Sequence, residues 1–197
     1  MDSVFRQKRS LRAELRSQRR EAAAANPEAA HVLRDIFLDT ISLPKSCLVG
    51  AYIAQGSEMN PAPLVKALQD QGYAIALPFI MENSGDLHFR AYQKGDALEA
   101  GGPFEIPQPR TEAALVVPDV FFVPLLGFDA KGNRLGQGRG YYDHYFEIMR
   151  SKKMLIAIGL AYDAQKRDFI PHTEHDQPLD AIVTETRVID PFVARQA

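Results

Sequence analysis

Cysteine is nearly absent from this chain. The single cysteine, Cys47, excludes a disulfide within the chain and suits a reducing compartment, so we expect a cytoplasmic location. Because Cys47 begins an apolar run, the pattern favours a buried structural thiol over a nucleophile. No hydrophobic stretch is long enough to cross a bilayer, and the first residues lack the apolar core of a signal peptide. We therefore expect no membrane as a partner.

An excess of charge of either sign is also missing. The formal net charge is −2, with 24% charged and 46% hydrophobic residues. This balance gives no overall reason to expect nucleic acid as a partner. The length of 197 residues and the ordinary globular composition predict a single domain spanning residues 1–197.

Glycine and basic residues, in contrast, gather in residues 128–145, which read FDAKGNRLGQGRGYYDHY. Four glycines lie among three cations in this segment: Gly132, Gly136, Gly138 and Gly140, with Lys131, Arg134 and Arg139. Glycine lets backbone amides approach a ligand closely, and consecutive amides in such a turn bind anions. A helix is expected to begin after Gly140, and its free N–H groups would also favour phosphate. The segment therefore indicates a site for nucleotide phosphates.

The same segment has a simpler interpretation as a glycine-rich surface hairpin that turns at Gly132 and Asn133. It is not a Walker loop, because no Gly-Lys-Ser/Thr follows the glycines. It does not match a dinucleotide fingerprint either, because its last three glycines alternate without the wider final gap.

Hydrophobic periodicity predicts alternating helices and strands. Helices are expected at residues 3–25, 27–41, 61–71 and 141–152, and strands at residues 47–53, 74–78, 87–91, 120–123, 155–161 and 181–184. The strand at 87–91 is expected at an edge, and residues 95–110 are expected to form a loop. This alternation predicts an α/β fold, a mostly parallel sheet with helices on both faces. Ligands of such sheets bind at the carboxyl ends of the strands, where the loops after Ile53, Val123 and Ala161 would meet.

The first two helices are amphipathic. Leu11, Leu15 and Ala22 form the apolar stripe of the first, and the second is expected to turn inward Val32, Leu33, Ile36, Phe37 and Ile41. Four cations share a neighbouring face of the first helix: Lys8, Arg12, Arg16 and Arg19. Lys8 and Arg12 could clamp a polyphosphate, but a solvated basic face is the slightly favoured interpretation from the residues alone.

Several polar residues are candidates for the chemistry. Glu58 follows a strand, where it could bind a ligand or cap the next helix. Tyr141 and Tyr142 are adjacent and cannot face the same way, so one could stack on a ligand while the other packs inward. Asp143, beside the glycines, is interpreted as a magnesium ligand rather than only a first-turn carboxylate.

The segment from residue 171 to 176, PHTEHD, places two histidines beside a carboxylate. It permits a transition-metal site, although no third ligand is evident nearby. A magnesium site with Asp176 as an oxygen ligand needs fewer protein ligands than a transition-metal site, because phosphate and water can supply the others. Asp180 is the alternative carboxylate.

The assembled residues resemble the 5-formyltetrahydrofolate cyclo-ligase family over essentially the whole chain. The matching residues, in order, are Lys8-x-x-Leu11-Arg12, Glu58, residues 106–109 (IPQP), 124–129 (PLLGFD), 132–136 (GNRLG), Gly138, 140–143 (GYYD), His175-Asp176 and Asp180. The glycine segment ending in Gly-Tyr-Tyr-Asp is the most specific of these matches.

The resemblance implies a three-layer α/β/α domain that converts 5-formyltetrahydrofolate into 5,10-methenyltetrahydrofolate with ATP and Mg²⁺. It implies that the partners are a small-molecule folate and ATP. We expect no nucleic acid as a partner, and we expect a monomer. It also implies roles for individual residues. ATP would be bound by Lys8, Arg9, Arg12, Arg134, Leu135, Gly136, Gln137, Gly138, Arg139, Gly140, Tyr141 and Tyr142. Catalytic roles would fall to Lys8, Arg139 and Tyr141, and the metal to Asp143 and Asp176.

The folate is expected on Glu58, with Tyr141 on the folate side and Ile53, Met59 and Phe104 as apolar cover. The sequence departs from the family pattern at Asn60-Pro61, where relatives often have an acidic residue and threonine, and at Gln137 and Arg139 in the glycine segment. Two other functions remain as alternatives. One is a sugar-phosphate isomerase or CoA transferase of the same broad architecture, and the other is a binder that sequesters folate or nucleotide.

Overall fold

A computed structural model describes residues 2–81, 84–101 and 106–192. An eight-stranded sheet with the order β12-β11-β10-β7-β1-β2-β3-β6 forms its centre. In chain order, these strands are β1 Leu48–Gly50, β2 Ala74–Ile80, β3 Leu87–Tyr92, β6 Leu115–Val116, β7 Val120–Pro124, β10 Ile156–Leu160, β11 Ala181–Val183 and β12 Val188–Ile189. The four pairings from β11 to β2 are parallel, and β12, β3 and β6 pair antiparallel with their neighbours. The mostly parallel sheet is thus confirmed.

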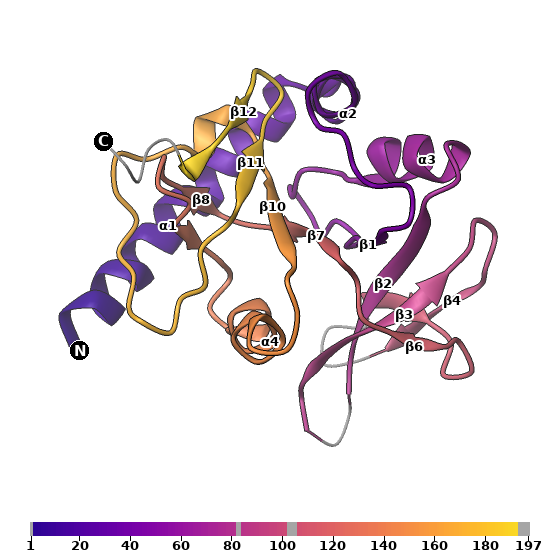
Figure 1. The fold of residues 1–197 in the computed structure, drawn as a ribbon. Helices are drawn as coiled ribbons and strands as arrows, with labels where there is room; N and C mark the ends of the chain where they lie inside the picture. The colour runs from indigo at the N-terminus through magenta and orange to yellow at the C-terminus, as the bar shows by residue number, and fades with distance from the viewer. Residues whose placement is uncertain (1, 82–83, 102–105, 193–197) are drawn as a thin grey trace.

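Helices cover both faces of this sheet (Figure 1). They are α1 Asp2–Ala25, α2 Ala29–Thr40, α3 Ala62–Asp70 and α4 Tyr141–Arg150, with a short 3₁₀ helix, η2, at Asp163–Gln165. Successive side chains of a strand point to opposite faces, and β7 shows the consequence. Phe122 packs against Phe37 of α2 with ring centroids 5.5 Å apart, and Phe121 packs against Phe146 of α4 at 5.2 Å. The α/β/α layers are therefore joined through one strand.

The first helix packs beside a small hairpin that carries the glycine segment. This hairpin pairs β8 (Gly127–Phe128) with β9 (Arg134–Leu135) in antiparallel register. Leu15 of α1 is fully buried in a separate cluster of apolar residues that includes Leu126 and Leu135. A Cβ added at Gly127 would lie 2.6 Å from Leu15 Cδ1, so any larger residue would have to displace the buried Leu15 side chain. The apolar stripe predicted for α1 thus fixes the helix against the glycine segment.

Residues 95–110 contain two strands, so the prediction of a loop is wrong. Leu98–Gly101 (β4) pairs antiparallel with Ile106–Pro109 (β5), on either side of residues outside the described ranges. The two prolines of β5 argued against a strand because proline cannot donate to a ladder. They stand two residues apart, however, and alternate positions of an antiparallel pair do not exchange hydrogen bonds.

Two further expectations are corrected. β3 is not at the edge, because it pairs with both β2 and β6, and the two-residue β6 was too short to recognise in the sequence. Val32 is 42% exposed, whereas Leu33 and Phe37 are buried, so the inward stripe of α2 is narrower than predicted. Within residues 2–81, 84–101 and 106–192, no helix is both long enough and apolar enough to cross a membrane.

Candidate active site at the carboxyl ends of the strands

The loops that follow β1, β7 and β10 meet at one rim of the sheet, as the sequence predicted. Arg19 of α1 joins the first two, since its Nε donates to Ser57 Oγ at 3.2 Å and its Nη1 to the Leu125 carbonyl at 3.3 Å. Gln165, after β10, donates through Nε2 to the same carbonyl at 2.8 Å. One carbonyl oxygen at the end of β7 thus links the three segments.

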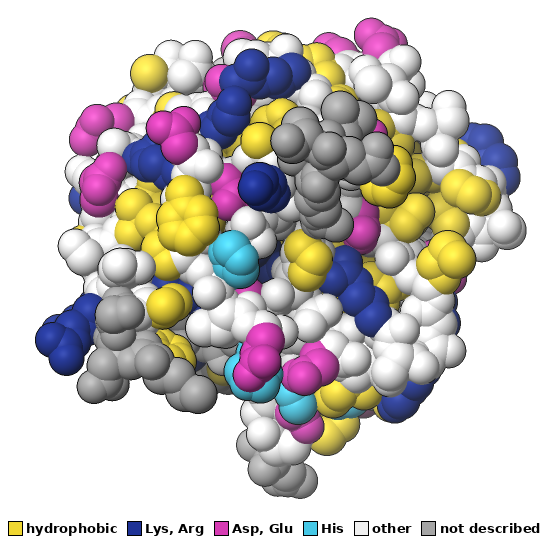
Figure 2. Space-filling model, turned by 60° about the vertical axis from the view of Figure 1, so that its left-hand side comes forward, with side chains coloured by type: hydrophobic (Ala, Val, Ile, Leu, Met, Phe, Trp, Pro, Cys, Tyr) yellow, Lys and Arg dark blue, Asp and Glu magenta, His cyan; other side chains and the backbone are white. Residues whose placement is uncertain are grey.

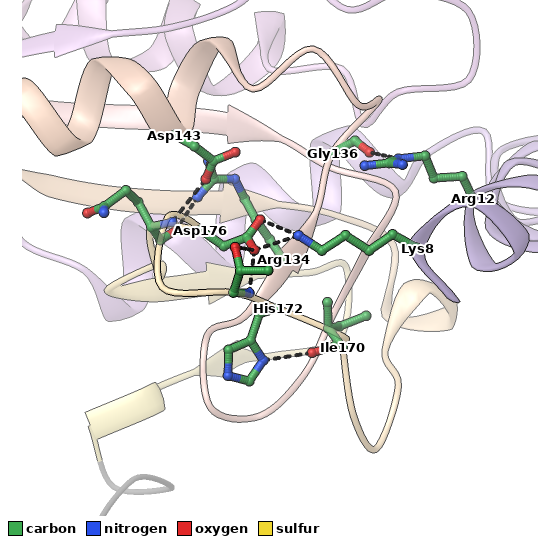
Figure 3. A network of polar contacts seen from close by, with 10 residues as sticks. Lys8, Arg12, Arg134, Gly136, Asp143, Ile170, His172 and Asp176 are labelled. Carbon is green, nitrogen blue, oxygen red and sulfur yellow. Dashed lines mark hydrogen bonds and ion pairs between the residues drawn. The ribbon is translucent and has the colours of Figure 1, made fainter. Parts of the chain in front are cut away.

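The basic face of α1 points into this rim rather than into solvent. Lys8 is 5% exposed and its Nζ donates to both oxygens of Asp176, at 2.6 and 2.5 Å (Figure 3). Arg12 Nε donates to the Gly136 carbonyl at 2.9 Å, and Arg16 Nε donates to Gln137 Oε1 at 3.1 Å. Burial, aided by the charge of Arg16, lowers the pKa of Arg12. The solvated interpretation of this face is therefore wrong for the buried Lys8, whose charge is balanced by a carboxylate.

The first half of the glycine segment is the tight hairpin turn that we considered as an alternative. The carboxylate of Asp129, which is 1% exposed, organises it by accepting four hydrogen bonds. Their donors are Lys131 N, Asn133 N, Asn133 Nδ2 and Ile170 N, at 3.0, 3.0, 2.9 and 3.1 Å. Gly132 has a φ of +84° within the turn. Both interpretations of the glycine segment therefore apply to different parts of it: its first half is a hairpin turn, and the proposed anion site lies in the half that follows.

The second half of the segment passes beneath α1 and leads into α4. Gly138 and Gly140 have φ values of +104° and +72°, in the region that favours glycine. A Cβ at Gly138 would lie 3.1 Å from Cζ of Arg12, so the guanidinium lies directly against this backbone. Gly140 precedes the first residue of α4, as expected, and leaves the amides of the first turn at the rim.

Asp143 lies in this first turn, beside a buried arginine. Its Oδ1 accepts from Arg134 Nη2 at 2.7 Å and from Gln177 N at 3.0 Å. Burial lowers the pKa of Arg134, and the charge of Asp143 opposes that effect. Figure 3 shows the second oxygen of Asp143 directed away from Arg134. This oxygen takes no part in the two bonds above.

Asp176 completes a pair of carboxylates with Asp143. Burial raises the pKa of Asp176, but the hydrogen bonds from Lys8 and Thr173 outweigh burial and hold it below its ordinary value. The neighbouring residue, Gln177, bonds Asp143 through its backbone, which brings the two carboxylates together. A set of two carboxylates suits Mg²⁺, which takes one or two carboxylates together with phosphate oxygens and water.

The alternatives for the metal do not reach this place. Asp180 accepts from Ala157 N at 2.8 Å and from Arg150 Nη2 at 3.0 Å. Ala157 is the second residue of β10 (Ile156–Leu160), so Asp180 lies toward the amino end of this strand and not at its carboxyl end. His172 lies with Nδ1 2.9 Å from the Ile170 carbonyl (Figure 3). Among the residues that the structure describes, no three His, Cys, Asp or Glu side chains form a metal-binding group.

Glu58 lies on the other side of the rim. Its side chain is 9% exposed, Oε2 accepts from Gln55 N at 3.0 Å, and Oε1 lies 3.6 Å from Arg19 Nη1. It does not cap α3, since the Ala62 amide at the helix start donates to Asn60 Oδ1 at 3.0 Å. Burial and, next, the charge of Glu58 raise the pKa of Tyr142. Tyr142, whose ring packs against Phe146 of α4, therefore lies within electrostatic range of Glu58.

The remaining predicted residues are distributed around these contacts. Leu135 is buried, Arg9 and Arg139 are exposed, and Tyr141 is partly buried beside the core. Ile53 is partly buried, but Met59 is 1% exposed and packs in the core, so it supports the loop instead of lining an open surface. Phe104 lies outside the described residues. Outside the grey atoms, Figure 2 shows acidic and basic side chains intermixed on the face that it presents.

Some contacts at the rim were not singled out from the sequence. Arg16 and Arg19 were recognised only as parts of a basic face, although their helical spacing from Lys8 and Arg12 was a usable signal. Thr173, which donates to Asp176 from its backbone and its hydroxyl at 2.6 and 3.0 Å, had no signal other than its place in the same turn.

Comparison with known proteins shows the family of this chain. The model of the 5-formyltetrahydrofolate cyclo-ligase family matches residues 4–185. The 5-formyltetrahydrofolate cyclo-ligase of Escherichia coli K12 is 31% identical over 145 residues, covering 71% of this chain and 79% of that protein. The enzyme of the same name from Mycolicibacterium smegmatis is 30% identical over 191 residues, covering 93% and 96%.

A solved structure extends the comparison to three dimensions. The NMR structure of Aquifex aeolicus 5,10-methenyltetrahydrofolate synthetase superposes with a TM-score of 0.74 at 26% identity, covering 93% of this chain and 92% of that chain. The family match spans the basic face of α1, the glycine segment and both carboxylates of the rim. This chain therefore belongs to the 5-formyltetrahydrofolate cyclo-ligase family.

Proposed function

We propose that this protein catalyses the ATP- and Mg²⁺-dependent cyclisation of 5-formyltetrahydrofolate to 5,10-methenyltetrahydrofolate. The formyl oxygen attacks the γ-phosphorus of ATP and ADP leaves. The folate nitrogen at position 10 then attacks the activated carbon and loses its proton, and phosphate departs with the former formyl oxygen. The observation that carries this proposal is the basic face of α1 closed over a glycine segment that leads into a helix start, with two carboxylates beside it.

The nucleotide is assigned to the junction of α1 with residues 134–142, where Arg12 lies against the backbone of Gly138. Lys8 and Arg12 supply positive charge, with Arg9 nearby on the same helix, and the amides after Gly138 supply donors for phosphate oxygens. Arg139, exposed at the end of the segment, is assigned to the transferring phosphoryl group. Phosphoryl transfer depends on such positioning and on neutralisation of the developing charge.

Magnesium is assigned to Asp143 and Asp176, which would hold it beside the nucleotide, where its charge would help to neutralise the phosphates. In the structure these carboxylates are already paired with Arg134 and Lys8. The second oxygen of Asp143 therefore offers the first ligand, while release of Lys8 from Asp176 would provide the second. The released Lys8 could then contact the nucleotide phosphates. The loss of the contact between Lys8 and Asp176 would thus help to bind both the metal and the nucleotide.

The folate is assigned to the rim beside Glu58. A carboxylate accepts hydrogen bonds from the amino and ring N–H groups of a pterin, and Ile53 is available as apolar cover. The charge of Glu58 acts on Tyr142, which supports a place for the pterin between the loop after β1 and the start of α4. Tyr141 remains assigned to the folate side as well.

The test is a mixture of purified protein, 5-formyltetrahydrofolate and Mg²⁺, with and without ATP, followed by the absorbance of the methenyl product. ATP-dependent product with stoichiometric ADP is the expected result. Product that forms equally without ATP would contradict the proposal, and binding of folate and ATP without turnover would favour the sequestering alternative. The monomeric state and the cytoplasmic location stay predictions, and gel filtration tests the first.

A further inference from the structure

Arg19 is a buried cation that no step of the proposed reaction uses. Its exposure is 6%, and it stands on the same face of α1 as Lys8 and Arg12 but farther along the helix. Burial lowers its pKa, and the charge of Glu58 opposes that shift most strongly. A buried arginine requires compensation by charge and hydrogen bonds, and its partners therefore indicate its purpose.

The hydrogen bonds that Arg19 donates go to Ser57 and to the Leu125 carbonyl and not to the carboxylate of Glu58, so they hold the guanidinium in place. Nε donates to Ser57 Oγ at 3.2 Å and Nη1 donates to the Leu125 carbonyl at 3.3 Å. That carbonyl is itself held by Gln165, which is 1% exposed and accepts from Tyr162 N through Oε1 at 2.8 Å. The guanidinium is thus fixed between the loop after β1 and the end of β7.

Glu58 lies close to this anchored charge but outside its hydrogen-bonding range. The distance from Arg19 Nη1 to Glu58 Oε1 is 3.6 Å, longer than a hydrogen bond. A carboxylate has about four acceptor positions, and Gln55 N occupies one of them on Oε2. The cation therefore balances the charge of a side chain that is 9% exposed while leaving its oxygens able to accept hydrogen bonds from a ligand.

We propose that Arg19 is a positioning residue for the folate, which balances the charge of Glu58 and keeps it oriented toward the pterin without using the oxygens that bind it. This inference rests on the proposed function. Because Arg19 lies on the helix that carries Lys8 and Arg12, α1 contributes to both substrates, the nucleotide near its start and the folate three turns later. Loss of Arg19 should consequently affect folate binding and spare nucleotide binding.

The experiment compares Arg19→Met with Arg20→Met, a matched change at an exposed arginine on the same helix. We expect Arg19→Met to raise the KM for 5-formyltetrahydrofolate about 10- to 100-fold, as for loss of one partner of a buried charge pair, with the KM for ATP within about twofold. Arg20→Met should change neither constant. An equal rise of both constants in Arg19→Met would overturn the proposal, because it would indicate only a structural role.

A double-mutant cycle with Glu58→Gln separates positioning from general destabilisation. If Arg19 acts through the charge of Glu58, Arg19→Met in the Glu58→Gln background should raise the folate KM by less than about threefold. The same factor in both backgrounds would refute the coupling. Should Arg19→Met fail to fold, Arg19→Lys keeps the charge but not the fork that reaches both anchors. It is expected to raise the folate KM selectively, and a folate KM equal to that of the unaltered protein would overturn the proposal.

A binding measurement keeps this inference distinct from the proposed reaction. Calorimetric titration of the unaltered protein with 5-formyltetrahydrofolate needs no turnover. If the protein binds folate but forms no product, the proposed reaction fails, and weaker binding by Arg19→Met still supports the role of Arg19. If the unaltered protein binds no folate, the role of Arg19 fails as well.

Discussion

Replacement of Gly138 by alanine tests whether the glycine segment and α1 form one nucleotide site. The new methyl group would lie 3.1 Å from Cζ and 3.3 Å from Nε of Arg12. These contacts are tighter than ordinary, so the guanidinium must move by roughly a few tenths of an ångström. The movement would weaken the bond from Arg12 Nε to the Gly136 carbonyl, which is 2.9 Å long.

Two separate effects contribute to the expected magnitude. A φ of +104° strains alanine by about 1–3 kcal/mol, which lowers the melting temperature by roughly 3–10 °C for a chain of this size. A hydrogen bond from a charged group contributes about 1.5–3 kcal/mol. Loss of about half of it would raise the KM for ATP roughly three- to tenfold.

The control separates backbone strain from the contact with Arg12. Gly95 has a φ of +96° and no atom within 4 Å of an added Cβ, so Gly95→Ala introduces similar strain in open space. Melting curves of both variants should show comparable destabilisation, and steady-state kinetics should show a raised KM for ATP in Gly138→Ala alone. An unchanged KM for ATP in Gly138→Ala, with the same loss of stability as Gly95→Ala, would refute the nucleotide site between α1 and this segment.

Three further changes test other parts of the site. Arg139→Ala should lower kcat about 100-fold or more with an unaltered melting temperature, because the side chain is exposed, and unchanged turnover would remove Arg139 from the reaction. Asp143→Asn should increase the Mg²⁺ concentration needed for half-maximal rate, and an identical titration curve would move the metal ligand elsewhere. Asp129→Ala should destabilise the protein by about 3 kcal/mol in thermal unfolding, because buried amides such as Ile170 N lose their acceptor. A melting temperature equal to that of the unaltered protein would contradict this role of Asp129.

The layers of the fold could be predicted because the strands at its centre are buried on both faces. Such strands are continuous apolar runs, and β7 and β10 were found within a residue or so of their bounds. The peripheral strands escaped because no buried face imposes a pattern on them. β4 and β6 hold no buried residue, and β5 carries two prolines, so neither periodicity nor propensity distinguished them from loops.

The sequence could indicate candidate residues of the site but not their pairings. Glycines and cations at close spacing indicate a phosphate site through local chemistry, and Asp143 became a candidate because it follows them directly. The sequence did not reveal that Lys8 reaches Asp176, since 168 residues separate the two and only the packing of α1 against the hairpin brings them together. For the same reason the basic face was interpreted as solvated, because a helix alone does not show what covers it.

These pairings bear on the order of events in the site. Lys8 contacts Asp176 and Arg134 contacts Asp143, so each proposed metal ligand already has a cationic partner in the structure. Arg134 is bound at its other end to the Gln177 carbonyl and packs over Phe146, which keeps it in place. Lys8 has a flexible stem and is a point charge, so it can transfer to phosphate with little rearrangement. If the metal binds as proposed, we expect Mg²⁺ and ATP to bind together, because the phosphates that would attract Lys8 away from Asp176 would also carry the metal.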